Sequence, residues 1–278
     1  MFNSIQPNQK ERIQKATWLL KQLGCSSSEY ADLVKEFQLS YGLAPDRIFG
    51  RKTYEKLFSA LMPIKRSKVS YAKTPMPRFT TAKRVCLHYT CAHNVDGSIA
   101  HWNTKSFAGG TPFVIDRQGN LYIVFDYRSG YSYHMGLKTE SAYLRDNFEC
   151  ATLGIELCNA GYTSKKNGLW VNPLGVVSDD ANVVQINPPH RKNMYYEEYT
   201  DAQILTLTRL VVLLSLEFEF DISRLNMDTM FDYDPKWNIN NRNGIITHCT
   251  VRQDKFDLAP TPKVVEFFNS LKSILAGG

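Results

Sequence analysis

Hydrophobic residues in the first part of the chain recur three and four positions apart, which is the spacing of helices. One such stripe runs over 9–23 and is expected to end at Gly24. A second follows the serines at 26–28, one of which is expected to cap it, and a third starts near Gly50. The pattern predicts a three-helix domain over residues 1–62, close to the lower size limit for independent stability.

The helical periodicity disappears in the next segment. Residues 63–80 contain three prolines and five basic residues, and no stripe of apolar positions runs through them. Because proline stiffens a chain that has no face to pack, we expect this segment to be a linker between two domains.

Strand and helix patterns alternate over residues 81–278. We expect a long helix at 200–220 with Thr200 as its N-cap, and a last helix over 262–275. Strands mixed with long helices predict an α/β domain with a central mixed sheet flanked by helices. The expected strands, two of which form a hairpin, are 84–90, 113–116, 121–125, 152–158 and 245–247.

Two segments of this second domain are expected to be long loops. Residues 160–198 and 221–244 are rich in asparagine, proline, glycine and aromatic residues. Loops of this length are usually functional or disordered. Their aromatic side chains are candidates for stacking on sugar rings or peptide, and equally for covering the edges of the fold itself.

The composition, 43% hydrophobic and 22% charged, is that of an ordinary globular protein. It excludes a disordered tail protein, a collagen-like fibre and a coiled coil. The net charge of +6 arises largely from 63–84, which hold seven basic residues and no acid, and such a segment suits an anionic surface. We expect no nucleic-acid partner, no stable membrane insertion and a monomer.

The sequence shows neither a membrane-spanning stretch nor a secretory signal, and this predicts where the protein is made and how it leaves the cell. The most apolar stretch, 204–220, carries three charged residues and is too short to span a membrane. The N-terminus is polar where a secretory signal needs an apolar core. We therefore expect synthesis in the cytoplasm and release by lysis or a secretion device. The six cysteines include no CxxC pair and are expected to be reduced and buried, with a disulfide as the alternative.

Two histidines follow apolar strand patterns. His88 lies at the end of the strand at 84–90, and His248 follows the strand at 245–247. Ligands of α/β sheets bind at strand ends, although a lone histidine of this kind is more often hydrogen-bonded in the core or at the surface. Asp257 comes nine residues after His248. Two histidines and one carboxylate are a typical catalytic zinc set that leaves one position for water.

Lys255 lies two residues before Asp257, so both side chains point to the same side of an extended backbone. The Lys255 ammonium would then stand beside the metal, where a cation stabilises an oxyanion. By composition alone, a solvated charged loop is the favoured alternative for both residues.

Five segments in one order resemble the zinc-dependent N-acetylmuramoyl-L-alanine amidase family, the type shared with phage amidases and peptidoglycan recognition proteins. The resemblance covers roughly residues 81–265, and the ordered set is its strong feature. The segments are the strand that ends in His88-Tyr89-Thr90, FVIDRQG at 113–119, LGIEL at 153–157, TDAQ at 200–203, and His248 with KFD at 255–257.

The resemblance implies a central mixed sheet with a zinc site at its edge. It implies His88, His248 and Asp257 as metal ligands, Glu156 as general base for the zinc-bound water, and Lys255 as the basic residue near the metal. The sequence departs from the family just before the strand at 113–116. Pro112 replaces a frequent histidine and Thr111 a tyrosine, so the base role falls to Glu156 and not to a tyrosine.

Candidate substrate-binding residues are Tyr89, His134, Trp170 and Trp237. His134 belongs to a segment that resembles the family's S-x-H-x-G pattern, and it either lines the substrate groove or braces the fold. Two cysteines lie near the expected ligands. A packing role is favoured for Cys249, whereas Cys86 shares the strand face of His88 and is harder to dismiss as a ligand.

Residues 8–62 resemble the three-helix peptidoglycan-binding domain. The pattern runs from Phe37-Gln38 through Gly42-Leu43 to Asp46, Gly50 and Thr53. Arg47 stands where a glycine is common. A helical dimerisation or docking module is the alternative.

Together the two resemblances imply a Zn2+ enzyme that hydrolyses the amide bond between N-acetylmuramic acid and L-alanine in peptidoglycan, its partner. A phage endolysin is the expected type, and a secreted antibacterial effector or a cytoplasmic recycling amidase are alternatives. The rival from another class is a non-catalytic peptidoglycan recognition protein. Such proteins typically lose the third ligand, whereas Asp257 is present here.

Overall fold

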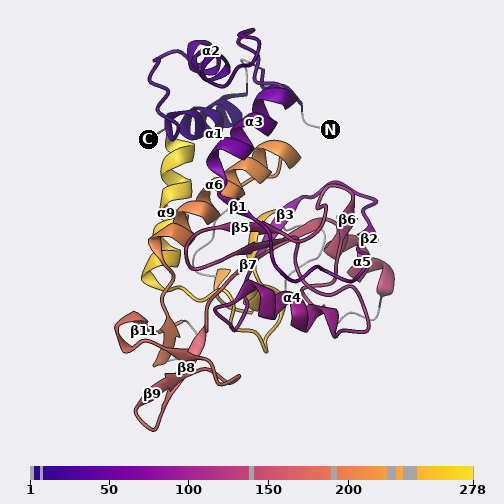
Figure 1. The fold of residues 1–278 in the computed structure, drawn as a ribbon, viewed down its shortest axis with the longest axis vertical. Coiled ribbons are helices and arrows are strands. Elements are labelled where there is room, and N and C mark those ends of the chain that lie inside the picture. The colour runs from indigo at the N-terminus through magenta and orange to yellow at the C-terminus, as the bar shows by residue number, and fades with distance from the viewer. Residues whose placement is uncertain are drawn as a thin grey trace.

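The computed structural model describes residues 3–6, 9–137, 141–188, 193–223, 230–233 and 243–277. A mixed sheet occupies the middle of the molecule, the N-terminal helices lie at one end, and a second sheet projects at the other (Figure 1). The architecture confirms the predicted α/β fold with a central mixed sheet flanked by helices. No helix of the described chain is long and apolar enough to cross a membrane.

The three helices expected at the N-terminus are present. They are α1 (Lys10–Lys21), α2 (Tyr30–Ser40) and α3 (Arg51–Leu61). The prediction that a serine caps α2 is wrong. Its N-cap is Glu29, and the backbone amides of Ser26 and Ser27 donate instead to the carboxylate of Glu36.

These helices do not stand apart from the rest of the chain. α1 packs on α6 (Asp201–Phe218) and α9 (Pro262–Ala276) (Figure 1), and α2 packs on α1. One hydrophobic core runs from the three helices into the central sheet. The Tyr54 hydroxyl lies 3.0 Å from the Glu217 carboxylate and 3.2 Å from the Leu213 carbonyl oxygen, both in α6. The N-terminal helices are therefore docked on the α/β domain.

Residues 63–80 lie along the α/β domain and make two short strand pairings with it. β1 (Ile64–Lys65) pairs in parallel with β5 (Leu121–Ile123) at the edge of the central sheet. β2 (Met76–Pro77) pairs antiparallel with β6 (Gly130–Tyr131). The segment expected to be a linker is thus held in place by backbone hydrogen bonds.

The central sheet has the strand order β1-β5-β4-β7-β3-β13. The predicted hairpin is confirmed as an antiparallel pair of β4 and β5, and β4 continues in parallel to β7. β3 pairs in parallel with β7 on one side and β13 on the other, which places three strand ends at one edge. The remaining strands are β3 (Arg84–Tyr89), β4 (Phe113–Ile115), β7 (Thr152–Leu157) and β13 (Gly244–Thr247).

Alternating residues of these strands face two different helical layers. Val85 and Leu87 belong to the core shared with α6 and α9, whereas Cys86 packs with Phe148 of α5 (Ala142–Cys150). The same opposite face carries Val114, which packs against α4 (Val95–Asn103). Side chains two positions apart share a face, so His88 lies on the side of α4 and α5.

Thr200 caps α6 as predicted. Its hydroxyl accepts from the Gln203 amide while the Gln203 side chain accepts from the Thr200 amide, which forms a complete capping box. The Thr200 hydroxyl also lies 2.8 Å from the Arg117 carbonyl oxygen, which ties the helix start to the turn after β4.

The expectation of a long loop at 160–198 is wrong. This segment forms an antiparallel sheet with the order β10-β9-β8-β12-β11, which projects away from the central sheet (Figure 1). The segment expected as a loop at 221–244 falls largely outside the described residues. The elements of the projecting sheet are β8 (Tyr162–Lys166), β9 (Leu169–Val171), β10 (Val177–Ser178), η1 (Asp180–Asn182), β11 (Val183–Ile186) and β12 (Met194–Glu197).

Candidate metal centre

The three side chains expected to bind metal meet at the ends of neighbouring parallel strands. His88 lies near the end of β3, and His248 begins α8 (His248–Val251) directly after β13. Asp257 returns to the same place from the loop that follows α8, where its carbonyl oxygen accepts from the Cys249 amide at 2.7 Å. Parallel pairing thus brings together two histidines that are 160 positions apart.

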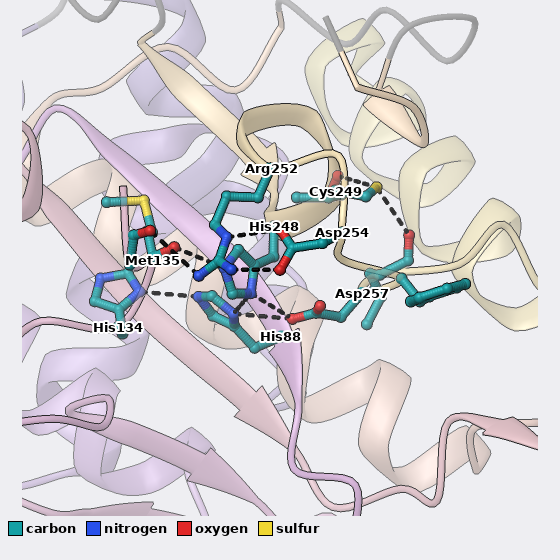
Figure 2. Close-up of polar contacts among 12 residues, drawn as sticks. His88, His134, Met135, His248, Cys249, Arg252, Asp254 and Asp257 are labelled. Atoms are coloured by element: carbon teal, nitrogen blue, oxygen red, sulfur yellow. Dashed lines mark hydrogen bonds and ion pairs between the residues drawn. The ribbon is translucent and has the colours of Figure 1, made fainter. Parts of the chain in front are cut away.

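The three candidate ligand atoms form a closed triangle (Figure 2). His88 Nδ1, His248 Nδ1 and Asp257 Oδ2 lie 3.0 Å from one another on every side. All three residues are buried. Their ligand atoms are close enough to bind one ion.

The contacts of this triangle call for a cation shared by its three atoms. His248 Nε2 lies 2.9 Å from the Met135 carbonyl oxygen, which only accepts, so the ring proton sits on Nε2 and Nδ1 carries a lone pair. That lone pair faces the Asp257 carboxylate oxygen at 3.0 Å. Two acceptors at this distance repel each other unless a proton or a metal ion lies between them. Two imidazole nitrogens and a carboxylate oxygen are a donor set of catalytic zinc, so these residues fit a zinc ion.

The charge states of the triangle also suit a metal. Burial, reinforced by His248, lowers the pKa of His88 to about 4, which keeps this ring neutral. Burial opposes ionisation of Asp257, but the two adjoining imidazoles prevail and hold its pKa below the ordinary value. Neutral imidazole and ionised carboxylate are the forms that bind metals.

The two nearby cysteines are poorer candidates. Cys86, His88 and His134 also present ligand atoms within 4.8 Å of one another. Burial raises the pKa of the Cys86 thiol well above its ordinary value, which disfavours the thiolate that a metal needs. The Cys249 sulfur lies 3.8 Å from the Met230 carbonyl oxygen and is absent from both groups. All six cysteines are free thiols.

Glu156 lies beside the triangle on the neighbouring strand. The parallel register of β3 and β7 pairs it with His88, so both side chains share one face of the sheet. Its buried Oε2 atom has no hydrogen-bond partner among the described residues. Burial, followed by the charge of Asp257, raises the pKa of Glu156 to about 8, and Lys255 opposes this rise. An isolated carboxyl group with a pKa near neutrality is suited to taking up and releasing a proton.

A cavity of about 1060 Å³ opens over these groups. Glu156 and Lys255 line it together with the triangle. Arg252 also lines the cavity. Its Nε donates to Asp254 Oδ1 at 2.9 Å and its Nη1 to the Gly136 carbonyl oxygen at 3.2 Å (Figure 2). The projecting sheet and its connection supply a more apolar wall, made by Ala160, Tyr162, Pro173 and Leu174.

A family model described as N-acetylmuramoyl-L-alanine amidase (Amidase_2) matches residues 78–260, which is more than half of the chain. The chain belongs to this amidase family. The matched range contains every residue of the triangle as well as Glu156 and Lys255. A search of curated proteins finds no significant match.

Three solved structures are loosely similar to this family member. AmiD from E. coli, in complex with anhydro-N-acetylmuramic acid-L-Ala-D-γ-Glu-L-Lys, has 16% identity and a TM-score of 0.42, over 72% of this chain and 60% of that one. The endolysin LysCS from Clostridium intestinale has 15% identity and a TM-score of 0.40, over 77% and 97%. A selenomethionine AmpD derivative has 13% identity and a TM-score of 0.38, over 76% and 94%.

The residues expected to bind substrate are dispersed. Tyr89 and His134 line the cavity, but the side chain of His134 is only 2% exposed. Trp170 stands in the projecting sheet, where it packs on Tyr195 with ring centroids 4.7 Å apart and is not among the cavity-lining residues. Trp237 lies outside the described residues.

Several cavity residues were not anticipated from sequence. Arg252 and Tyr162 line the cavity, and Glu149 lies against its floor next to His134. Arg252 carried no signal beyond its place in a charged loop. Glu149 did carry a signal in the sequence. It stands between the apolar residues Phe148 and Cys150, and an acid in an apolar segment needs a polar partner if it is buried.

Proposed function

We propose that this member of the amidase family is a zinc-dependent N-acetylmuramoyl-L-alanine amidase, which hydrolyses the amide bond between N-acetylmuramic acid and L-alanine in peptidoglycan. The observation that carries the proposal is the triangle of His88, His248 and Asp257, whose ligand atoms lie 3.0 Å from one another at the cavity. Family membership supplies the substrate class.

The residues around the triangle fit amide hydrolysis. Zinc bound by the three ligands would polarise the scissile carbonyl group and acidify the attacking water. Glu156 takes the proton from that water and delivers it to the leaving nitrogen of L-alanine, a role that its unpartnered Oε2 supports. The Lys255 ammonium at the cavity wall stabilises the negative charge that develops on the carbonyl oxygen.

The test combines metal analysis with product identification. The purified full chain is assayed on peptidoglycan as isolated, after chelation and after addition of zinc, and the muropeptides are identified by mass spectrometry. We expect free L-alanine amino termini to appear, to be lost on chelation and to return with zinc. His88→Ala and Asp257→Ala should lose both zinc and activity.

His101→Ala is the matched control, because His101 also lines the cavity but lies outside the triangle. It should retain zinc. Undiminished release of L-alanine termini by His88→Ala or by the chelated enzyme would refute the metal-hydrolase proposal. An inactive wild-type chain that binds peptidoglycan would favour the recognition-protein alternative.

We further propose that α1–α3 bind the cell wall and that the enzyme degrades it, as an endolysin or a secreted antibacterial effector does. Support comes from the sequence resemblance of residues 8–62 and from a small groove beside α2 formed by Ser27, Asp32, Lys35 and Leu39. Sedimentation with insoluble peptidoglycan tests this. In a Glu156→Gln background, which prevents digestion, Leu39→Asp should reduce the sedimented fraction, and an unchanged fraction would exclude this groove.

A further inference from the structure

One buried acid takes no part in the proposed hydrolysis. Glu149, at the end of α5, has no exposed surface. Its two oxygens accept backbone N–H groups, Oε2 from His134 and Oε1 from Met135, each at 3.2 Å. Burial raises the pKa of Glu149 to about 8, and these amide donors oppose the rise because they bind the ionised form. Burial of an ionisable group costs free energy of folding, so the contacts of Glu149 are candidates for a functional role.

The two residues that Glu149 holds are the ones that touch both candidate histidine ligands. The Met135 carbonyl oxygen lies 2.9 Å from His248 Nε2. The Nδ1 atom of His134 lies 2.9 Å from His88 Nε2 (Figure 2). In each ligand, the nitrogen outside the triangle is therefore engaged by this one short segment.

The direction of these contacts decides which nitrogen is free to bind a metal. His134 Nε2 points toward Glu149 Oε2 at 3.6 Å, which is too long for a hydrogen bond but favours a proton on Nε2 over a lone pair. His134 Nδ1 then accepts, and His88 Nε2 donates. His248 Nε2 donates to Met135 in the same way. Both ligands are left with the Nδ1 lone pair facing the triangle.

We propose that Glu149 and His134 are positioning residues, which hold His88 and His248 in the Nε2–H tautomer and so present both Nδ1 atoms to the metal. The inference rests on the proposed zinc amidase function. Partners of this kind fix the tautomer and the ring orientation of metal-binding histidines, and their removal typically weakens metal binding about 10- to 100-fold.

Space for the His134 ring is built into the neighbouring strand. A Cβ atom on Gly154 of β7 would lie 3.0 Å from His134 Nδ1 and 2.4 Å from Thr111 Cγ2. A side chain larger than hydrogen at this position would clash with Thr111 and press against the His134 ring. The glycine of the LGIEL segment is thus explained by the close packing of Thr111 and His134 on this strand.

The experiment measures zinc affinity by competition with a chromophoric chelator at pH 8.5, above the pKa of about 8 of Glu149. We expect Glu149→Gln and His134→Phe to bind zinc about 10- to 100-fold more weakly than the wild type. His134→Gln should recover part of the affinity, because its amide oxygen can accept from His88 Nε2. Glu217→Gln is the matched control, since Glu217 is a largely buried, hydrogen-bonded acid away from the triangle. It should alter thermal stability without altering zinc affinity.

A second measurement requires no variant. With 15N-labelled histidine, long-range 15N–1H correlation spectra of the zinc-bound chain report each tautomer, and we expect Nε2–H for His88 and His248. A proton on His88 Nδ1, or zinc affinities that match the wild type in Glu149→Gln and His134→Phe, would overturn the inference. So would an equal loss of affinity in Cys86→Ser, because His134 would then act as a ligand in the Cys86 group. A wild-type chain that binds no zinc would instead refute the proposed function, and the inference with it.

Discussion

At the scale of single residues, Glu156 shows how burial prepares a side chain for chemistry. It pairs in register with His88 on one side and Val114 on the other, so the sheet places its carboxyl group beside the triangle. The same placement removes it from water and leaves Oε2 without a hydrogen-bond partner in the described structure. A position that costs stability in this way is typical of a functional group.

Replacement of Glu156 by glutamine should separate catalysis from metal binding. The amide is isosteric but cannot accept a proton, so we expect Glu156→Gln to lose about 10²- to 10⁴-fold in activity. Zinc content should stay at the wild-type level, because Glu156 is not in the triangle. Release of L-alanine amino termini and metal analysis check the two expectations. Near-normal activity would remove Glu156 from the base role.

The same substitution should change how stability depends on pH. In the metal-free native state Glu156 keeps its proton up to about pH 8, whereas in the unfolded chain it loses it near its ordinary pKa of 4.5. Between these values the native state binds more protons, so this residue's contribution to stability falls as pH rises. Glutamine has no proton to lose. The melting temperature of Glu156→Gln, relative to wild type, should therefore increase from pH 5 to pH 8.

This comparison is made by thermal denaturation of chelated protein in matched buffers. A difference in melting temperature that is the same at both pH values would show that the pKa of Glu156 is not raised in the native state. At pH 8 we expect a lower melting temperature for the wild type than for Glu156→Gln, because the buried carboxyl group serves catalysis at the expense of stability.

At the scale of elements, local signals predicted most of the central domain. Residues close in sequence determine the apolar runs of β3, β7 and β13. They also determine the capping box at Thr200. The position of His88 and His248 at strand ends followed from the same runs. The contacts of His134 with His88 and Glu149 did not, because they join residues brought together only by the tertiary fold.

The projecting sheet was missed for a physical reason. Strands such as β8 (YTSKK) and β11 (VVQI) are short and partly exposed on both faces, so they lack the strict alternation that reveals a half-buried strand. Their stability comes from pairing with one another, as in the register of β11 with β12. Cross-strand pairing is not visible along a single strand.

The turn between β9 and β10 offers a test of substrate recognition. Asn172 is buried, and its Nδ2 donates to the Ala160 carbonyl oxygen at 2.8 Å while its Oδ1 accepts the Leu174 amide at 2.9 Å. This rigid turn presents Leu174, which is 73% exposed, at the cavity wall. We expect Leu174→Asp to raise KM for peptidoglycan about 3- to 10-fold with little change in kcat, because an apolar contact worth about 1 kcal/mol is lost.

Leu169→Asp is the control for this prediction. Leu169 lies in the same sheet and is 56% exposed, but it is not among the residues that line the cavity. Its substitution should leave KM unchanged. Equal effects of the two variants would mean that charge on the projecting sheet, and not contact at the cavity, changes substrate binding.

At the scale of the whole molecule, the N-terminal helices and the amidase domain share one core. Glu217 of α6 lies at the junction: the Tyr54 hydroxyl of α3 and the Tyr127 hydroxyl each lie 3.0 Å from its carboxylate, and Arg128 forms an ion pair with it. A tethered domain on a flexible linker would make no such contacts. The helices therefore hold a fixed orientation relative to the central sheet (Figure 1).

This junction predicts that the chain unfolds as one cooperative unit. Tyr54→Phe removes a buried hydroxyl from the Glu217 carboxylate, and hydrogen bonds to charged groups contribute about 1.5–3 kcal/mol. Calorimetry should show a single transition that moves to lower temperature as a whole. Tyr143→Phe, at a tyrosine 75% exposed on α5, should leave it in place. Two transitions, of which only one moves, would mean that the N-terminal helices unfold independently of the amidase domain. That result would contradict the shared core as a single cooperative unit and the fixed orientation inferred from it.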